Sequence, residues 1–134
     1  MLIMNWMSQP AITIDIDGFV EDAIRLLKKH EIHMLPVMKN GQLVGIVTDW
    51  DIKNAIASDI SSTKLEDGRH PLSGVEVKKI MTSDPVTIAD DCTFEEAVEK
   101  LLVHNISGLA VVNQQQEVVG VITNRDLLKA QGQS

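Results

Sequence analysis

The stretch LVGIVTDWDI at residues 43–52 returns as VVGVITNRDL at residues 118–127. Both copies keep a glycine, a threonine three residues later and an aspartate three residues after that, namely Gly45, Thr48 and Asp51, then Gly120, Thr123 and Asp126. The two residues between threonine and aspartate change, from Asp49 and Trp50 to Asn124 and Arg125. A long phrase repeated at this distance is typical of a chain made of two copies of one structural unit.

The repeat extends over nearly the whole chain. Residues 7–38 align with residues 81–112 without a gap, and one further residue is inserted before the second phrase. The first residues, MLIMNWMS, correspond to VEVKKIMT at residues 75–82 and lack the basic region of a signal peptide, so we expect them to belong to the fold. The organisation predicted is a first repeat at 1–57, a linker at 58–74 and a second repeat at 75–134.

Each repeat has the same expected order of elements, β-α-β-β-α. Apolar residues at helical spacing predict helices, and alternating or wholly apolar runs predict strands. The dipeptide Asn40-Gly41 predicts a tight hairpin. The expected strands cover residues 11–16, 34–38 and 43–48, then 85–89, 108–112 and 118–123. The expected helices cover residues 20–30 and 49–57, then 94–104 and 124–131.

A unit of roughly 60 residues buries too little apolar surface to be comfortably stable alone. The expected strands are apolar at nearly every position, which predicts that both faces of each sheet are covered. We therefore expect an α/β (α+β) fold in which the two sheets pack against each other around a pseudo-twofold axis, so that the two repeats form one domain.

Composition narrows the class of partner. The chain has 134 residues, 12 basic and 19 acidic side chains, a net charge of −7 and no cluster of lysines and arginines. A nucleic-acid-binding protein normally carries a basic stripe, and a membrane span needs roughly 18 consecutive apolar residues, so neither partner is expected. The single cysteine, Cys92, excludes an internal disulfide and fits a reducing cytoplasm. No base lies near it in the sequence, so we expect a packed or surface thiol.

The motif threonine and aspartate stand where a strand turns into a helix. Such a pair forms a capping box, which is worth on the order of 1 kcal/mol. Three features favour a ligand as well: a glycine inside a strand, which indicates a close approach to the backbone, apolar flanking residues, and a helix N-terminus that suits phosphate. A carboxylate here can accept both hydroxyls of a ribose, and a neighbouring guanidinium can hold phosphate. Capping and ligand binding are compatible.

Two β-α-β-β-α copies, each with a start like MTSDPVTI, a middle like HEIHMLPV and an end like GIVTDWDI, resemble a tandem pair of CBS domains, a Bateman module. The resemblance covers residues 1–57 and 75–131. It implies a regulatory sensor, with no cofactor of its own, that binds AMP, ADP, ATP or S-adenosylmethionine in the clefts between repeats. It also implies a homodimer built mainly from helices, and a regulated protein that is reached in trans.

In that family the motif aspartate holds the ribose, the motif threonine faces ribose and phosphate, and the partner repeat lines the adenine. The resemblance then implies a primary cleft made of Ile12, Ile32, His33, Val121, Thr123, Arg125 and Asp126. The second cleft would use Ile46, Thr48, Asp51, Val86, Ile106 and Ser107. Arg125 matches an arginine often seen on phosphate, whereas Trp50 departs from that pattern. We therefore expect the Asp126 cleft to take a phosphorylated ligand first and the Asp51 cleft to bind weakly or to prefer a ligand with little negative charge.

Other interpretations are weaker. His30 and His33 lie three residues apart, but His33 becomes Ser107 in the second repeat and no acid or cysteine cluster completes a metal site. We find no nucleophile–base pair and no phosphate-binding loop, so we expect no enzyme. The alternative is a structural or dimerisation module with vestigial clefts. Retention of both threonines and both aspartates favours the sensor, because capping alone tolerates Ser, Asn or Asp in place of Thr.

Overall fold

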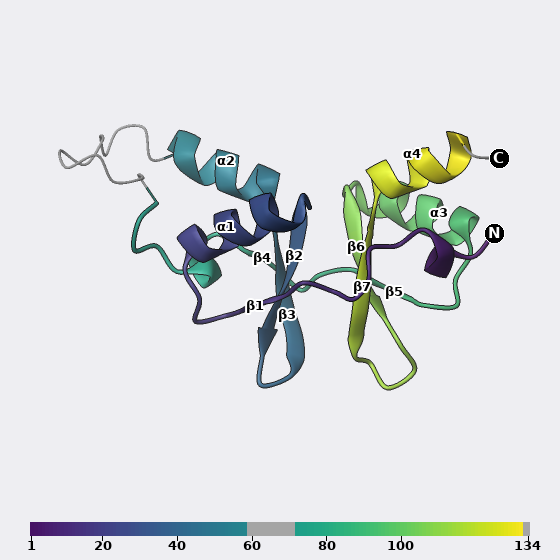
Figure 1. The fold of residues 1–134 in the computed structure, drawn as a ribbon, viewed down its shortest axis with the longest axis horizontal. Coiled ribbons are helices and arrows are strands. Elements are labelled where there is room, and N and C mark those ends of the chain that lie inside the picture. The colour runs from purple at the N-terminus through teal and green to yellow at the C-terminus, as the bar shows by residue number, and fades with distance from the viewer. Residues whose placement is uncertain (59–71, 133–134) are drawn as a thin grey trace. The chain divides into compact units, whose positions relative to one another are not determined.

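The computed structural model describes residues 1–58 and 72–132 (Figure 1). The first repeat contains the short 3-10 helix η1 (Ile3–Asn5), then β1 (Ile14–Asp15), α1 (Val20–His30), β2 (Met34–Lys39), β3 (Gln42–Thr48) and α2 (Asp49–Ser58). The second contains η3 (Val77–Lys79), β4 (Thr82–Ser83), β5 (Thr87–Ala89), α3 (Phe94–His104), β6 (Gly108–Val112), β7 (Val118–Thr123) and α4 (Asn124–Gly132). Within these residues no helix is long and apolar enough to cross a membrane. Most of the linker predicted at 58–74 lies outside the described ranges.

The predicted order of elements is confirmed. α1 and α3 have the predicted bounds, and both end at a residue in the left-handed conformation, which terminates a helix. Asn40 and Gly41 have φ values of 50° and 78°, as the predicted tight hairpin requires. The first strand is shorter than expected, because only Ile14 and Asp15 pair with β2.

The chain folds into two compact units that do not coincide with the sequence repeats. The first-motif unit contains residues 13–40 and 44–84 and carries Thr48 and Asp51. The second-motif unit contains residues 1–12, 41–43 and 85–134 and carries Thr123 and Asp126. The opening segment of each repeat therefore joins the unit that holds the other repeat's motif.

In the second-motif unit, β5, β6 and β7 form a three-stranded sheet in that order, parallel then antiparallel. Both helices lie on one face of this sheet, α3 against β6 and α4 against β7 (Figure 1). The N-terminal segment closes the unit through backbone bonds from Phe94 to Met1 (2.8 Å) and from Ile3 to Cys92 (3.1 Å). Its buried core consists of Ile3, Met7, Ile88, Ala97, Leu101, Leu109, Val111, Ile122 and Leu127.

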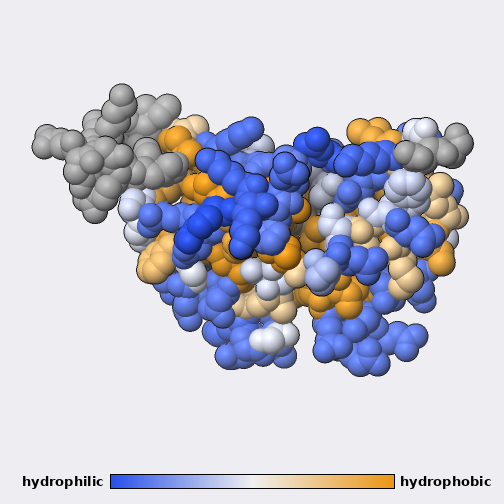
Figure 2. Space-filling model, in the orientation of Figure 1, coloured by the Kyte–Doolittle hydropathy of each residue, from blue (hydrophilic) through white to orange (hydrophobic). Residues whose placement is uncertain are grey.

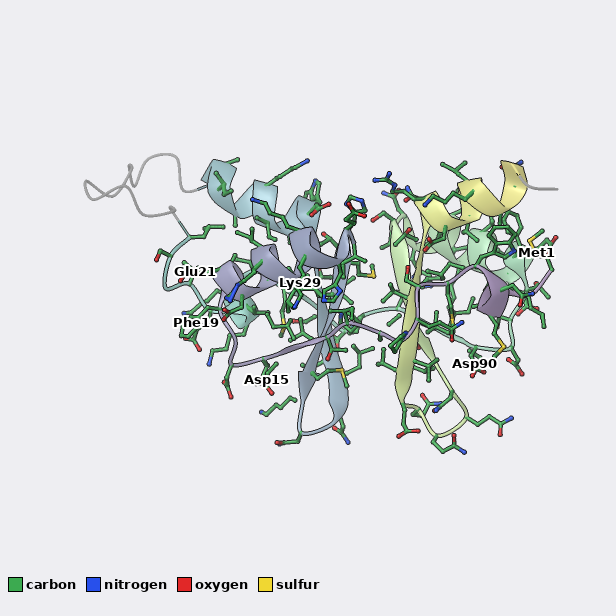
Figure 3. The ribbon with its side chains drawn as sticks, viewed as in Figure 1. Met1, Asp15, Phe19, Glu21, Lys29 and Asp90 are labelled. Carbon is green, nitrogen blue, oxygen red and sulfur yellow. The ribbon has the colours of Figure 1, made fainter. Side chains whose placement is uncertain are left out.

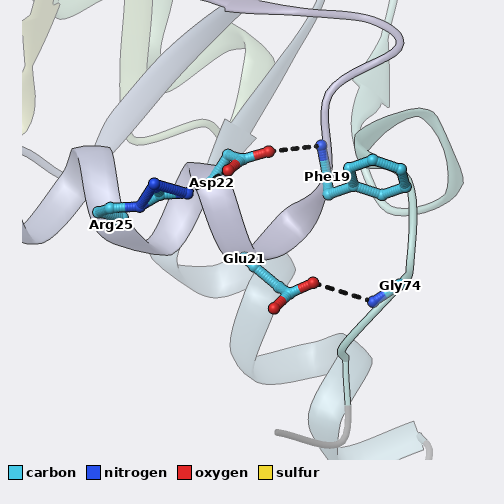
Figure 4. A network of polar contacts seen from close by, with 5 residues as sticks. All are labelled: Phe19, Glu21, Asp22, Arg25 and Gly74. Carbon is cyan, nitrogen blue, oxygen red and sulfur yellow. Dashed lines mark hydrogen bonds and ion pairs between the residues drawn. The ribbon is translucent and has the colours of Figure 1, made fainter.

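In the first-motif unit, β1 to β4 form a four-stranded sheet in chain order, with β1 parallel to β2 and β4 antiparallel to β3. Residues 72–80, which lead into β4, also hold the start of α1. The Val20 N–H donates to the Val75 carbonyl at 2.8 Å, and the Gly74 N–H donates to Glu21 Oε1 at 3.2 Å (Figure 4). The opening of the second repeat is thus an integral part of this unit.

Charge along α1 follows the helix dipole. The Phe19 N–H donates to Asp22 Oδ2 at 3.3 Å, and Arg25 pairs with the same carboxylate (Figure 4). Glu21 lies near the start of the helix and Lys29 near its end (Figure 3). Acids at the N-terminus and bases at the C-terminus each add about 0.3–1 kcal/mol on an exposed helix.

The motif glycines have a structural cause that the sequence did not reveal. A Cβ placed on Gly45 would lie 2.9 Å from the Thr82 carbonyl oxygen, and one on Gly120 would lie 2.6 Å from the Ser8 carbonyl oxygen. The group that approaches each glycine is therefore the opening segment of a repeat. The close approach that these glycines indicate is made by protein backbone, so the glycines by themselves give no support for a bound ligand.

We predict that Gly120→Ala lowers the free energy of unfolding by about 1–3 kcal/mol, because the new methyl group overlaps a backbone carbonyl that cannot rotate away. Gly132→Ala is the matched control, since nothing lies within 4 Å of a Cβ there, and its effect should stay within about 0.5 kcal/mol. Urea unfolding followed by circular dichroism measures both. Equal stability of the two variants would contradict the close approach.

Candidate ligand-binding site

The first motif forms a capping box at the start of α2. The Thr48 N–H donates to Asp51 Oδ2 at 2.9 Å, and the Asp51 N–H donates to Thr48 Oγ1 at 3.2 Å. The Thr48 hydroxyl also donates to Asp51 Oδ2, at 3.0 Å. The predicted cap is confirmed, and it fixes the position of the carboxylate.

The second motif repeats this geometry at the start of α4. The Thr123 N–H and hydroxyl donate to Asp126 Oδ2 at 2.9 and 3.1 Å. The Asp126 N–H lies 3.4 Å from Thr123 Oγ1. Each aspartate therefore caps its helix with one oxygen, Oδ2, and this leaves Oδ1 for another donor.

The two aspartates differ at Oδ1. Asp51 Oδ1 accepts a hydrogen bond from the Thr82 hydroxyl at 3.2 Å, and the Asp51 residue is only 7% exposed. Asp126 is partly exposed, and all the bonds that its carboxylate receives from the described residues go to Oδ2. The second motif thus presents a carboxylate oxygen with unused acceptor capacity.

The residues just before β2 and β6, namely His33 and Ser107, also meet the motif helix of their own repeat. The Asp49 N–H donates to the His33 carbonyl at 3.2 Å, and the Asn124 N–H donates to the Ser107 carbonyl at 2.9 Å. In addition, His33 Nδ1 contacts the Asp49 carboxylate. A histidine–carboxylate pair therefore flanks the first motif at a place where the second repeat has a serine and an asparagine.

The second of the two residues between the motif threonine and the motif aspartate is exposed in both repeats. Trp50 is 68% exposed in the first turn of α2, and Arg125 is exposed at the corresponding position of α4.

Behind the first motif, a pocket of about 450 Å³ is lined by Asp51, Asn54, Ala55, Leu72, Val75, Lys79 and Ile80. Thr82 and Lys79 were not among the predicted site residues, because they belong to the sequence of the second repeat but surround the first motif.

The predicted clefts combine residues of both units. Of the primary set, the second-motif unit contains Ile12, Val121, Thr123, Arg125 and Asp126, and the first-motif unit contains Ile32 and His33. Of the second set, the first-motif unit contains Ile46, Thr48 and Asp51, and the second-motif unit contains Val86, Ile106 and Ser107. Both clefts stay predictions. Within the second-motif unit, Val86 and Ile106 pack against the buried core.

Cys92 packs against the same core and is partly buried. Burial raises the pKa of its thiol, and a hydrogen bond with Glu96 and the charge of that carboxylate raise the pKa further. A raised pKa keeps the thiol protonated and weakly nucleophilic at neutral pH. Across the described residues, no group of three or more His, Cys, Asp or Glu side chains is placed to hold a metal ion.

The family follows from comparison with known proteins. The sequence profile of the CBS domain matches residues 3–58 and 77–132. The chain belongs to the CBS domain family and is a tandem CBS pair. A CBS domain-containing protein of Dictyostelium discoideum is 36% identical over 128 residues, which make up 95% of this chain and 88% of that protein.

Other relatives are longer. An L-aspartate semialdehyde sulfurtransferase of Methanocaldococcus jannaschii is 31% identical over 98% of this chain, and an inosine-5'-monophosphate dehydrogenase of Korarchaeum cryptofilum is 33% identical over 92%. The chain spans only 23% of the length of each enzyme.

Solved structures with this fold include ligand complexes. The CBS domain pair of protein MJ0100, in complex with 5'-methylthioadenosine and S-adenosyl-L-methionine, matches with a TM-score of 0.81 and 30% identity over 99% of this chain and 97% of that one. CBSX2 from Arabidopsis thaliana, in complex with AMP, matches with a TM-score of 0.73 and 26% identity over 98% and 96%. Both proteins are CBS pairs with adenosine-containing ligands.

Proposed function

We propose that this chain is a regulatory module that binds an adenosine-containing ligand at its motif aspartates, with Asp126 as the stronger site. The observation that carries the proposal is the geometry of Asp126. Its Oδ2 is held by Thr123 while its Oδ1 keeps acceptor capacity at a partly exposed helix N-terminus. Similarity to CBS pairs that bind 5'-methylthioadenosine, S-adenosyl-L-methionine or AMP supports the ligand class.

The chemistry of each group fits that ligand. A carboxylate oxygen with spare lone pairs accepts ribose hydroxyls, and the guanidinium of Arg125 suits phosphate oxygens. Val121 is buried beside the motif, and the residues proposed to line the adenine come from the other repeat. His33, Ile32 and Ile12 complete the proposed primary cleft, and the Asp51 set forms a second, weaker one. The module acts on a separate regulated protein and has no catalytic role of its own.

A structural module without a ligand is the second candidate. The capping boxes favour it, because helix capping alone accounts for every bond that Thr123 and Asp126 make with each other. The two candidates separate on one property, which is whether the folded chain is stabilised by adenosine compounds.

Thermal unfolding with a ligand panel makes that separation. A ligand that binds only the folded state adds RT ln(1 + [L]/Kd), which is about 2.7 kcal/mol at a hundred times Kd. We expect at least one of AMP, ADP, ATP and S-adenosylmethionine to raise the melting temperature, and GMP to have a smaller effect. No shift with any of them at millimolar concentration would favour the structural candidate.

Asp126→Ala tests the residue itself. The variant removes a charged acceptor whose bonds to two ribose hydroxyls are each worth about 1.5–3 kcal/mol, so affinity for AMP should fall roughly a hundredfold or more. The fold should lose no more than a cap, about 1 kcal/mol. Isothermal titration calorimetry measures the affinity, and urea unfolding measures the stability.

Arg125→Ala is the matched control for the phosphate. It should weaken AMP binding by about ten- to thirtyfold, since one charge pair near a protein surface is discounted by solvent, and it should hardly affect adenosine. Normal AMP binding by Asp126→Ala would show that Asp126 serves only as a cap. Equal losses for adenosine and AMP in Arg125→Ala would show that the arginine does not contact phosphate.

A homodimer is also proposed, formed by α3 and α4 of two copies. Leu102, Val103 and Leu128 are 75%, 72% and 65% exposed, and a groove of about 330 Å³ runs between the two helices. Apolar atoms reach the surface over α4, whereas mostly hydrophilic residues cover α1 (Figure 2). An isologous interface needs the same apolar patch on both subunits, and α3 and α4 supply one. Acids on α3 (Glu95 and Glu99) and Lys129 on α4 allow unlike charges to face each other across it.

Light scattering should give twice 14.8 kDa for the wild type. Leu102→Glu should shift the mass toward the monomer, because it places a charge inside the proposed interface. Lys28→Glu, on the charged face of α1, is the control and should stay dimeric. A monomer at high protein concentration would contradict the homodimer. The apolar patch on α3 and α4 would then have to bind a protein other than a second copy of this chain.

A further inference from the structure

The Thr82 hydroxyl donates a hydrogen bond to Asp51, but the equivalent residue of the first repeat does not make such a bond to Asp126. Thr82 follows Met81 in β4, and its Cα is paired with that of Ile46 in the strand that precedes the first motif. The equivalent residue in the first repeat is Ser8, which follows Met7 and forms a bridge with Val121. The backbones correspond, yet Thr82 Oγ1 donates to Asp51 while the hydrogen bonds that join Ser8 to Val121 are backbone bonds of 2.9 and 3.1 Å.

Threonine and serine differ in the freedom of their side chains. Threonine is branched at Cβ, and its side chain has few favourable rotamers, which restricts the directions that its hydroxyl can take. Serine has no methyl group, and its hydroxyl rotates freely toward water or other acceptors. Among the described residues, a protein hydroxyl therefore bonds to Oδ1 of the motif aspartate in the first motif and not in the second.

We propose that Thr82 is a specificity-determining residue that closes the first motif to a ligand diol. Its hydroxyl occupies the Asp51 oxygen that corresponds to the unused oxygen of Asp126, and the aspartate is buried around that bond. Thr82 takes one of the two lone pairs of Asp51 Oδ1, so a diol that bonds to this oxygen with both hydroxyls has to displace Thr82, whereas Asp126 Oδ1 accepts both directly. The proposal rests on the proposed function, because it assumes that the ligand carries a ribose.

The test isolates the first motif. In an Asp126→Ala background, Thr82→Val removes the hydroxyl and keeps the branched shape that suits a strand. NMR titration with adenosine, read at the amides of Thr48 and Asp51, measures binding down to millimolar affinity. The double variant should bind adenosine roughly tenfold or more tightly than Asp126→Ala alone, as expected for one hydroxyl bond to a carboxylate. The gain should vanish with 2',3'-dideoxyadenosine, which lacks the diol.

Two controls keep the outcome clear. Thr82→Ala in the same background repeats the test if valine disturbs β4, and Ser8→Val in the wild type should leave adenosine binding at Asp126 unchanged. No gain in adenosine affinity from either folded Thr82 variant would overturn the proposal, and so would an equal gain for the dideoxy compound. The proposed function fails by a different result, which is the absence of adenosine and AMP binding in the wild type.

Discussion

The contact between the opening segment of each repeat and the strand before each motif is the interaction on which the rest of the structure depends. Ser8 pairs with Val121, and Thr82 pairs with Ile46. These short antiparallel pairings place residues 1–12 in the second-motif unit and residues 75–84 in the first-motif unit. They bring a backbone carbonyl so close to the motif strand that only glycine fits opposite it, and they carry the Thr82 hydroxyl to Asp51.

The motif threonine and aspartate combine a structural and a proposed chemical role in one arrangement. The cap uses the threonine N–H, the threonine hydroxyl and Oδ2 of the aspartate, and it adds about 0.5–2 kcal/mol to stability. Because the cap fixes the carboxylate at a helix N-terminus, Oδ1 is positioned for a ligand without further ordering. A site built in this way can lose its ligand during evolution and keep its fold, and for this reason capping geometry by itself does not identify a sensor.

Much of the fold could be predicted from the sequence because its signals are local. Apolar residues at helical spacing fixed α1 and α3 to the residue, and Asn40-Gly41 marked the hairpin. The motif glycines were taken as a sign of a ligand, but the group that fills the space beside Gly120 is a protein carbonyl that lies more than a hundred residues before it in the chain. The role of Thr82 was invisible for the same reason: it lies 31 residues from Asp51, and Ser against Thr looks conservative in an alignment of the repeats. Contacts between residues of one motif were predicted from the sequence. Contacts between the opening segment of one repeat and the motif of the other repeat were not.

The most direct test of unequal motifs is a titration of the uniformly 15N-labelled protein with AMP, followed by NMR from substoichiometric ligand upward. Both motifs carry a Thr and an Asp amide in equivalent positions, so each site reports independently in one sample. The predicted result is that the amides of Thr123 and Asp126 shift and reach saturation first, while those of Thr48 and Asp51 shift only at much higher AMP concentration. Simultaneous saturation of the two pairs, or saturation of Thr48 and Asp51 at the lower AMP concentration, would contradict it.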